Sequence, residues 1–416
     1  MIRTKHVFTI LATLYASLII GFYLGEDLIG GSYFDYKGLY YLNEKFKYNF
    51  IITFFHYDQL GHRQSPVLYI IRSLFVDNET IQRLFFLHLF LLIPIFFYNS
   101  LKIIYKDIDK NYLRLLASTI LLIPAFRSYS IWTDPHLLGT IFFTLSLYFF
   151  LKFKKQKKIN ANSYYSCISL AISAYISPNF GVFIIFYFYG FFIKFGFSKN
   201  LLKIIFLNIF LSLPFFTYLF YFDVNFIFDN KGWDIGNNFY SLENIANKIL
   251  IISSIYFFNL IPFLNVKKIF KETKILFKFN FFYLLTILFF LICISLFNFE
   301  ETYNLTNSGG GFFYNLSNFL FENNYLFYFI TAIAFLFISH SIFLDKKNLL
   351  LFICLILSNP QITIWQANFS PTIFFLILLL FSSNLIITKF NKKRIFIVYI
   401  YFILYSLISI FKNILI

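Results

Sequence analysis

The residues that could carry chemistry are concentrated in short polar segments between long apolar runs. The first such segment contains Asp35 and the adjacent pair His62 and Arg63, and the second runs from Arg127 to His136 and contains Asp134. A positioned carboxylate can take a proton from a hydroxyl group, while Arg and His can neutralise a phosphate. These residue types predict group transfer involving a phosphate-bearing substrate.

Aromatic side chains accompany these polar residues. Tyr129, Trp132 and His136 lie in the second segment, and Gln366 lies in a polar turn near the C-terminal end. Aromatic faces pack on sugar rings and prenyl chains. We therefore expect these four residues to bind a substrate that is part lipid and part sugar or phosphate.

Each of these residues also has a simpler interpretation. Asp35 and Asp134 could be helix N-caps, a position at which Asp is favoured. Arg127 could extend from the end of a membrane span into the headgroup region, and His62 with Arg63 could lie in a solvated loop. Trp132 also fits the aromatic belt at a membrane surface.

The elements that would position these residues are membrane helices. The chain has 416 residues, of which 59% are apolar, 24% aromatic and 13% charged. This composition is typical of an all-α polytopic membrane protein and excludes an ordinary soluble enzyme. The net charge of +16 does not indicate nucleic-acid binding, because the Lys and Arg residues lie in short clusters between apolar runs.

We predict about 11–13 transmembrane helices, because a span needs roughly 20 apolar residues. The loop 25–79 is too polar for a span, and we expect helices lying in the membrane interface at 36–55 and 66–75. The remaining polar outer segments are 223–247, 300–324 and 359–371. The predicted spans are 7–24, 80–100, 113–126, 137–151, 163–177, 179–195, 203–222, 247–264, 279–298, 324–343, 348–358, 371–388 and 395–411.

The charges predict the orientation of these spans. Most of the 35 Lys and Arg residues fall in alternate loops, and most of the 19 Asp and Glu residues fall in the others. Since cytoplasmic loops collect positive charge, we expect a multi-pass protein of the plasma (inner) membrane with a cytoplasmic N-terminus. Asp35 and Asp134 would then lie on the non-cytoplasmic face.

The N-terminal part, roughly residues 1–155, resembles the C-type (GT-C) membrane glycosyltransferases. The similarity is carried by SYFDYKGLYYL around Asp35, by HRQSPVLYIIRSLF after it, and by PAFRSYSIWTDPHLLGTIFFTLSLYFFLK around Asp134. The resemblance implies a polyprenyl-phosphate sugar donor, a first-loop acid acting as base or metal ligand, and a similar fold. It implies that Asp35 and Asp134 are the catalytic pair.

Two departures from the common pattern bear on metal use. Asp35 is followed by Tyr36, and Asp134 is followed by Pro135 and His136, so neither belongs to a run of acidic residues. Hard cations prefer several oxygen ligands. We therefore favour a site without cofactor or metal, although a divalent metal stays open.

The sequence thus predicts a single integral-membrane domain, 1–416, that transfers a hexose or pentose with inversion. The acceptor would be a glycan, a lipid-linked molecule or a protein, as in assembly of cell-envelope glycan or lipopolysaccharide. Membrane lipid is an expected partner and nucleic acid is not. Two alternatives stay open: a flippase of lipid-linked saccharides, and a glycan polymerase or ligase that depends on Arg63 and Arg127.

Overall fold

The computed structural model describes residues 3–62, 64–156, 159–226, 242–265, 268, 281–299, 309–359, 364–384 and 390–415. Within these ranges the regular structure is helical, and the one antiparallel bridge, between Gly309 and Trp365, stands outside any strand. The prediction of an all-α protein is confirmed for this part of the chain. The chain divides into two compact units, unit 1 (1–233 and 403–416) and unit 2 (234–402), which are described separately.

Eight helices among the described residues are long and apolar enough to cross a membrane, which supports a polytopic membrane protein. Three further apolar helices, 281–295, 347–357 and 366–379, are shorter. The prediction of a protein with several membrane spans is therefore supported, whereas the predicted number of 11–13 is not established by these helices. The eight are Thr4–Leu24, Glu79–Ile104, Pro135–Lys154, Pro178–Phe195, Lys199–Tyr221, Asn244–Phe263, Tyr325–Leu344 and Lys392–Lys412.

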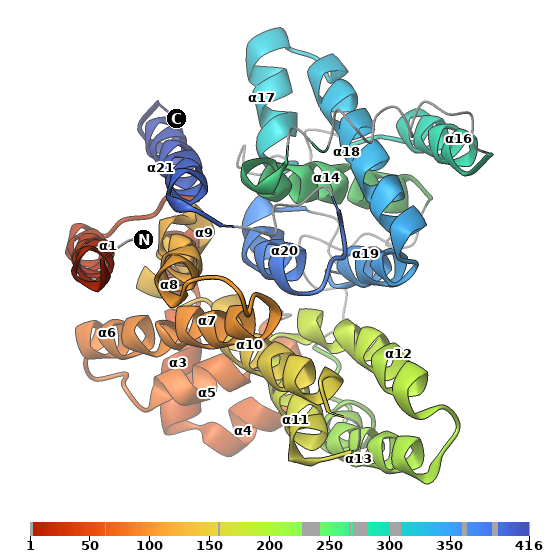
Figure 1. The fold of residues 1–416 in the computed structure, drawn as a ribbon. Helices are drawn as coiled ribbons and strands as arrows, with labels where there is room; N and C mark the ends of the chain where they lie inside the picture. Colours follow the sequence, from red (N-terminus) through yellow and green to blue (C-terminus); the bar gives the residue numbers. More distant parts are fainter. Residues whose placement is uncertain are drawn as a thin grey trace. The chain divides into compact units, whose positions relative to one another are not determined.

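Helix α10 (Pro135–Lys154) is central to unit 1. It packs against α7 (Leu92–Ile104) on one side and α11 (Ala161–Ile176) on the other, as Figure 1 shows. Gly139 permits a close approach, because a Cβ there would lie 2.8 Å from the Ser177 side chain. The N-terminal end of α10 is thereby fixed, and Asp134 lies directly before it.

The first polar segment, 25–79, folds into several short helices. The predicted single helix 36–55 is wrong: the chain forms α2 (Ser32–Gly38), α3 (Tyr40–Tyr48) and α4 (Phe50–Phe55). The breaks fall at Leu39, directly after Gly38, and at Asn49, whose backbone leaves the helical region, and Gly and Asn are both weak helix formers. A helix is present where the second one was predicted, as α5 (Val67–Ser73), and it begins after Pro66; its place in the membrane interface stays a prediction.

The predicted span 113–126 is also wrong as one helix. It consists of α8 (Lys110–Ser118), a 3₁₀ turn (Thr119–Leu122) and α9 (Pro124–Ile131). Ile123 is extended, as expected for the residue before a proline. This break brings α9, and Trp132 at its end, beside the other elements of the site. The remaining helices up to residue 90 are α1 (Thr4–Leu24) and α6 (Glu79–Phe90).

Helix α13 (Lys199–Phe216) contains a proline near its C-terminal end. This residue is Pro214, and the helix continues as a π-helical turn, Thr217–Tyr221. The Tyr175 hydroxyl donates to the Leu211 carbonyl at 2.7 Å and accepts from the Phe215 N–H at 3.2 Å. A side chain from α11 therefore bridges two backbone groups of α13 on either side of Pro214.

Unit 2 is built around α14 (Leu242–Leu260), which packs against each of the five following helices. In Figure 1 these helices run from green to blue. Helix α20 begins at Gln366, so the predicted start of that span at 371 is too late; residues 385–388 of that span lie outside the described part of the chain. The five are α16 (Phe281–Ser295), α17 (Gly311–Phe321), α18 (Tyr325–Leu344), α19 (Lys347–Leu357) and α20 (Gln366–Leu379).

Candidate functional site

Asp35 and Asp134 line the same pocket, which we call the acidic pocket. Asp35 comes from α2 and Asp134 from the turn between α9 and α10. The pocket encloses about 10 Å³, room for roughly one water molecule. Among the described residues its lining is Ser32, Asp35, Tyr36, Leu39, Gln64, Tyr69, Arg72, Trp132, Thr133, Asp134 and Pro135.

Asp134 is the N-cap of α10. Its Oδ1 accepts a hydrogen bond from the His136 N–H at 2.7 Å, which confirms the capping interpretation but does not conflict with a place in the pocket. Thr133, before it, has a φ of 52°, an uncommon conformation for a β-branched residue. Burial, together with the negative charge of Asp35, raises the pKa of Asp134 to about 7.

Asp35 differs from Asp134 in its surroundings. It lies in the first turn of α2, whose N-cap is Gly31 with a φ of 127°, so the N-cap interpretation of Asp35 is wrong. The residue is exposed, whereas Asp134 is partly buried. The pocket therefore carries one accessible carboxylate and one that burial shifts towards its protonated form.

Arg72 is a positively charged residue in the lining of the acidic pocket. The sequence patterns described above did not indicate it. Its side chain is 2% exposed, and its guanidinium carbon lies 4.3 Å from the centre of the Tyr36 ring. Burial lowers the pKa of Arg72. Within the described residues it forms no ion pair, and its Nη2 atom is buried without a hydrogen-bond partner. Such an atom is unusual in a folded protein and favours a ligand site.

Two hydroxyl groups of the acidic pocket share this property. Ser32 Oγ and Thr133 Oγ1 are buried and have no hydrogen-bond partner. Together with Arg72 Nη2, they give the pocket three uncommitted polar atoms capable of donating a hydrogen bond. A charge within the apolar run VLYIIRSLF is the signal that would have pointed to Arg72.

The wall of the acidic pocket is aromatic. The Trp132 indole donates from Nε1 to the Glu26 carbonyl at 3.0 Å, and its ring lies 3.8 Å from the Arg83 guanidinium carbon. Tyr36 and Trp132 have ring centres 5.8 Å apart. Trp132 is thus buried in the protein, although a belt position in the membrane interface would leave it more exposed.

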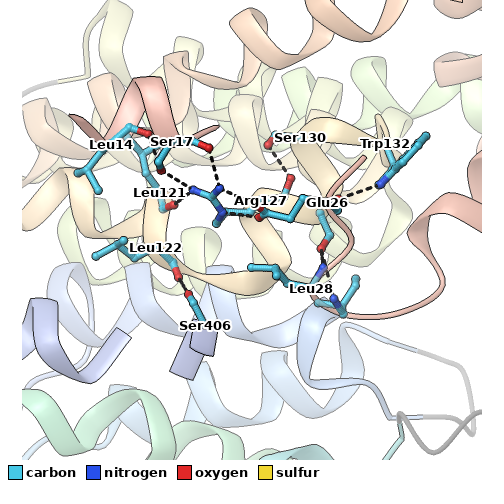
Figure 2. Close-up of polar contacts among 12 residues, drawn as sticks. Leu14, Ser17, Glu26, Leu28, Leu121, Leu122, Arg127, Ser130, Trp132 and Ser406 are labelled. Carbon is cyan, nitrogen blue, oxygen red and sulfur yellow. Dashed lines mark hydrogen bonds and ion pairs between the residues drawn. The ribbon is translucent and has the colours of Figure 1, made fainter. Parts of the chain in front are cut away.

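Arg127 is held elsewhere, in a structural network (Figure 2). Its Nε and Nη2 pair with the Glu26 carboxylate at 2.5 and 2.7 Å. Nη1 donates to Ser17 Oγ and the Leu121 carbonyl, and Nη2 also donates to the Ser17 carbonyl. A guanidinium has five N–H donors, and these five bonds occupy them. Arg127 does not line the acidic pocket, so this arrangement supports a structural role for it.

His62, Tyr129 and His136 belong to unit 1 and are not among the residues that line the acidic pocket. His62 bonds to the Tyr41 hydroxyl at 2.5 Å, and burial lowers the pKa of His62. The Tyr129 carbonyl accepts from the Asp134 N–H, and the His136 ring stacks on Phe180.

Gln366 belongs to unit 2, where its Oε1 accepts from the Phe312 N–H. Arg63 lies outside the described residues, as do 227–241 and 300–308 of the polar outer segments.

In the described part of the chain, no group of three or more His, Cys, Asp or Glu side chains is arranged to hold a metal. Cys167, Cys293 and Cys354 are buried free thiols. Comparison of the chain with protein-family models, with curated proteins and with solved structures gave no match. The function therefore has to be inferred from the residues of the acidic pocket.

Proposed function

We propose that the protein is an integral-membrane glycosyltransferase that moves a sugar from a polyprenyl-phosphate donor to a hydroxyl acceptor on a glycan, lipid-linked molecule or protein. The observation that supports it is that Asp35, Asp134 and Arg72 line one aromatic pocket in a chain with membrane-length helices. Cell-envelope glycan or lipopolysaccharide assembly is the role that this reaction would serve.

In the proposed reaction, Asp35 is the general base. Its exposed carboxylate takes the proton of the acceptor hydroxyl as that oxygen bonds to the anomeric carbon. The bond from the anomeric carbon to the phosphate oxygen breaks, and its electron pair leaves with the polyprenyl phosphate. Attack opposite the leaving group inverts the anomeric centre.

Arg72 would compensate the charge that develops on the leaving phosphate. A buried guanidinium acts in a low-dielectric site, where its field is screened less than in water. In our proposal it takes the role that the sequence assigned to Arg127, His62 and Arg63. Asp134, with its raised pKa, would orient a substrate hydroxyl.

The pocket must open to admit a donor, because its enclosed volume of about 10 Å³ is far below that of a sugar. Four of its lining residues come from α2 and Leu39, and three more from α5 and the residues before it. Short helices joined by single-residue breaks can shift more readily than a long span. We therefore assign the opening motion to the 32–73 region.

Asp35→Asn tests the proposal. Loss of a general base lowers the rate by about 10²–10⁴-fold, so a deletion strain carrying this variant should lack the added sugar when its glycans are analysed by mass spectrometry. Asp58→Asn, which changes a carboxylate of the same segment outside the acidic pocket, is the matched control. A wild-type glycan in the Asp35→Asn strain would overturn the proposal.

A flippase of lipid-linked saccharides is the second candidate. The observation that favours it is Pro214 within α13 and the π-helical turn that follows, because helices interrupted by Pro are common in transporters. The same deletion strain separates the two functions. A transferase leaves a glycan that lacks one sugar, whereas a flippase leaves intact lipid-linked saccharide on the cytoplasmic side.

A further inference from the structure

Gln82 connects three elements around the acidic pocket. It lies in α6, is fully buried, and accepts a hydrogen bond at Oε1 from the Tyr36 hydroxyl at 2.8 Å. The same Oε1 accepts from Arg72 Nε at 3.3 Å, and Gln82 Nε2 donates to the Arg72 carbonyl at 2.7 Å. One amide therefore fixes both the backbone and the guanidinium of Arg72.

Burying the Gln82 amide costs free energy unless its hydrogen bonds compensate for the lost contact with water. Gln82 lies within the membrane-length helix 79–104, where an apolar residue would pack without a desolvation penalty. Arg72 is the partner in two of its three hydrogen bonds. The position of Arg72 is thus the main consequence of having Gln at residue 82.

The charges of the acidic pocket explain why that position needs to be held. Arg72 lies in the same pocket as Asp35 and Asp134 yet forms no ion pair in the described structure. The charge of Arg72 acts on Asp134, and opposite charges attract more strongly where burial limits screening by water. Without a restraint, the guanidinium would turn towards a carboxylate and lose its uncommitted Nη2.

The other charged groups around Arg72 have partners of their own. Glu79 of α6 pairs with Lys37 at 2.7 Å, and Arg83 donates to the Ile131 carbonyl at 3.0 Å. Tyr36 of α2 offers its ring face, and Tyr69 of α5 lies with its ring centre 5.9 Å from the guanidinium carbon. The restraint on the guanidinium thus comes from Gln82 and the Tyr36 ring.

We propose that Gln82 is a positioning residue that holds the Arg72 guanidinium away from Asp35 and Asp134, so that it stays available to a phosphate monoester. This inference rests on the proposed function for the identity of the ligand, the phosphate of a polyprenyl carrier. Gln82 itself does not touch the ligand. Its effect on binding passes through Arg72.

The test measures binding of undecaprenyl phosphate to the purified full-length protein in nanodiscs, a probe that requires no knowledge of the sugar. Gln82→Leu is expected to weaken binding at least ten-fold, because Arg72 then pairs with a carboxylate. Adding Asp134→Asn removes that competitor and should recover most of the lost affinity. Gln59→Leu, which changes an exposed Gln outside the pocket, should bind as the wild type does.

Gln82→Glu serves as a second variant if Gln82→Leu does not fold. Glu keeps the acceptor atoms but places a competing charge on residue 82, so binding should weaken and Asp134→Asn should not restore it. Wild-type affinity in both Gln82 variants would overturn the proposal for Gln82 alone. A Gln82→Leu loss that Asp134→Asn does not reduce would overturn it too, since a purely structural defect behaves in that way. Failure of the wild type to bind would overturn both this proposal and the proposed function.

Discussion

At the scale of single residues, Arg127 and Arg72 of unit 1 are held in opposite ways. Arg127 has its charge balanced by Glu26 and all five donors occupied. Arg72 is equally buried but stacks on Tyr36 and keeps an uncommitted Nη2. The first arrangement stabilises the fold, and the second leaves binding capacity.

Arg127→Gln is therefore expected to affect stability and not ligand binding. Breaking a buried ion pair costs about 3–5 kcal/mol, because the remaining charge is left uncompensated. The unfolding midpoint in detergent should fall well below that of Arg114→Gln, a control whose Arg bonds to Asn111 one helical turn earlier. Weaker undecaprenyl phosphate binding by the folded Arg127→Gln protein would instead return Arg127 to the binding site.

Asp134 predicts a specific dependence of stability on pH. Its pKa of about 7 in the folded protein lies above the ordinary value, so the folded state binds this proton more tightly than the unfolded state does. The contribution of Asp134 to the free energy of unfolding is greatest below pH 4 and falls as pH rises through 7. Thermal unfolding from pH 4 to 8 should show that Asp134→Asn removes this fall, and parallel curves for the two proteins would contradict the assignment.

The sequence allowed the two carboxylates of the pocket to be predicted, but not the cation that accompanies them. Asp35 was predicted from the resemblance carried by SYFDYKGLYYL, and Asp134 from that resemblance together with its place directly before an apolar run. The partner of Arg127 is Glu26, 101 residues earlier, and the partner of Arg72 is Gln82 in another helix. Pairings of this kind depend on tertiary packing, which residue spacing does not specify.

At the scale of elements, one hydroxyl group from α11 bridges two backbone groups of α13. Pro214 cannot donate a backbone hydrogen bond, and Tyr175 contacts the Leu211 carbonyl and the Phe215 N–H on either side of it. These contacts border an apolar groove of about 480 Å³ that includes Tyr175, Pro214 and Phe54. Helices α11 and α13 are thus joined by a polar contact within an apolar environment.

Tyr175→Phe should destabilise the protein by about 0.5–1.5 kcal/mol, since it removes a hydrogen-bond partner from a part-buried carbonyl and a part-buried N–H. Pro214→Ala should make the loss smaller, because a regular α13 can pair the Phe215 N–H directly with the Leu211 carbonyl. Unfolding midpoints of the two single variants and the double variant give the coupling energy. Strict additivity would show that the Tyr175 hydroxyl acts independently of Pro214.

The elements that the sequence predicted incorrectly are those where local backbone preferences override apolar periodicity. Gly38 and Asn49 divide the helix expected at 36–55, and Pro124 divides the span expected at 113–126. Other apolar runs, as in α1 and α10, were placed within a few residues of their observed bounds, and the glycines within them, Gly21 and Gly139, do not divide them. A hydropathy pattern therefore predicts that a segment is buried better than it predicts that the segment is one helix.

At the scale of the whole molecule, the charge pattern predicts the orientation in the membrane. The loop that contains Phe197 is flanked by Lys194, Lys199 and Lys203, whereas the region around Tyr33 is flanked by Asp27 and Asp35. Since positive loops stay in the cytoplasm, position 33 should lie outside and position 197 inside. Both side chains are exposed, at 41% and 93%.

Single cysteines at these two positions test the orientation, after the three buried native cysteines have been replaced by Ala. A membrane-impermeant maleimide added to intact cells should label Tyr33→Cys. It should label Phe197→Cys only after the membrane has been permeabilised. The reverse pattern would place Asp35 on the cytoplasmic side and remove the basis for an outer-face enzyme.

The pairing of Glu26 with Arg127 also has a consequence for how the protein is made. At a synthesis rate of about 5–20 residues per second, the 101 residues between them take roughly 5–20 s to emerge. During that interval the Glu26 carboxylate exists without the guanidinium that pairs with it in the folded protein. Water or a lipid headgroup has to solvate that charge until Arg127 has been synthesised.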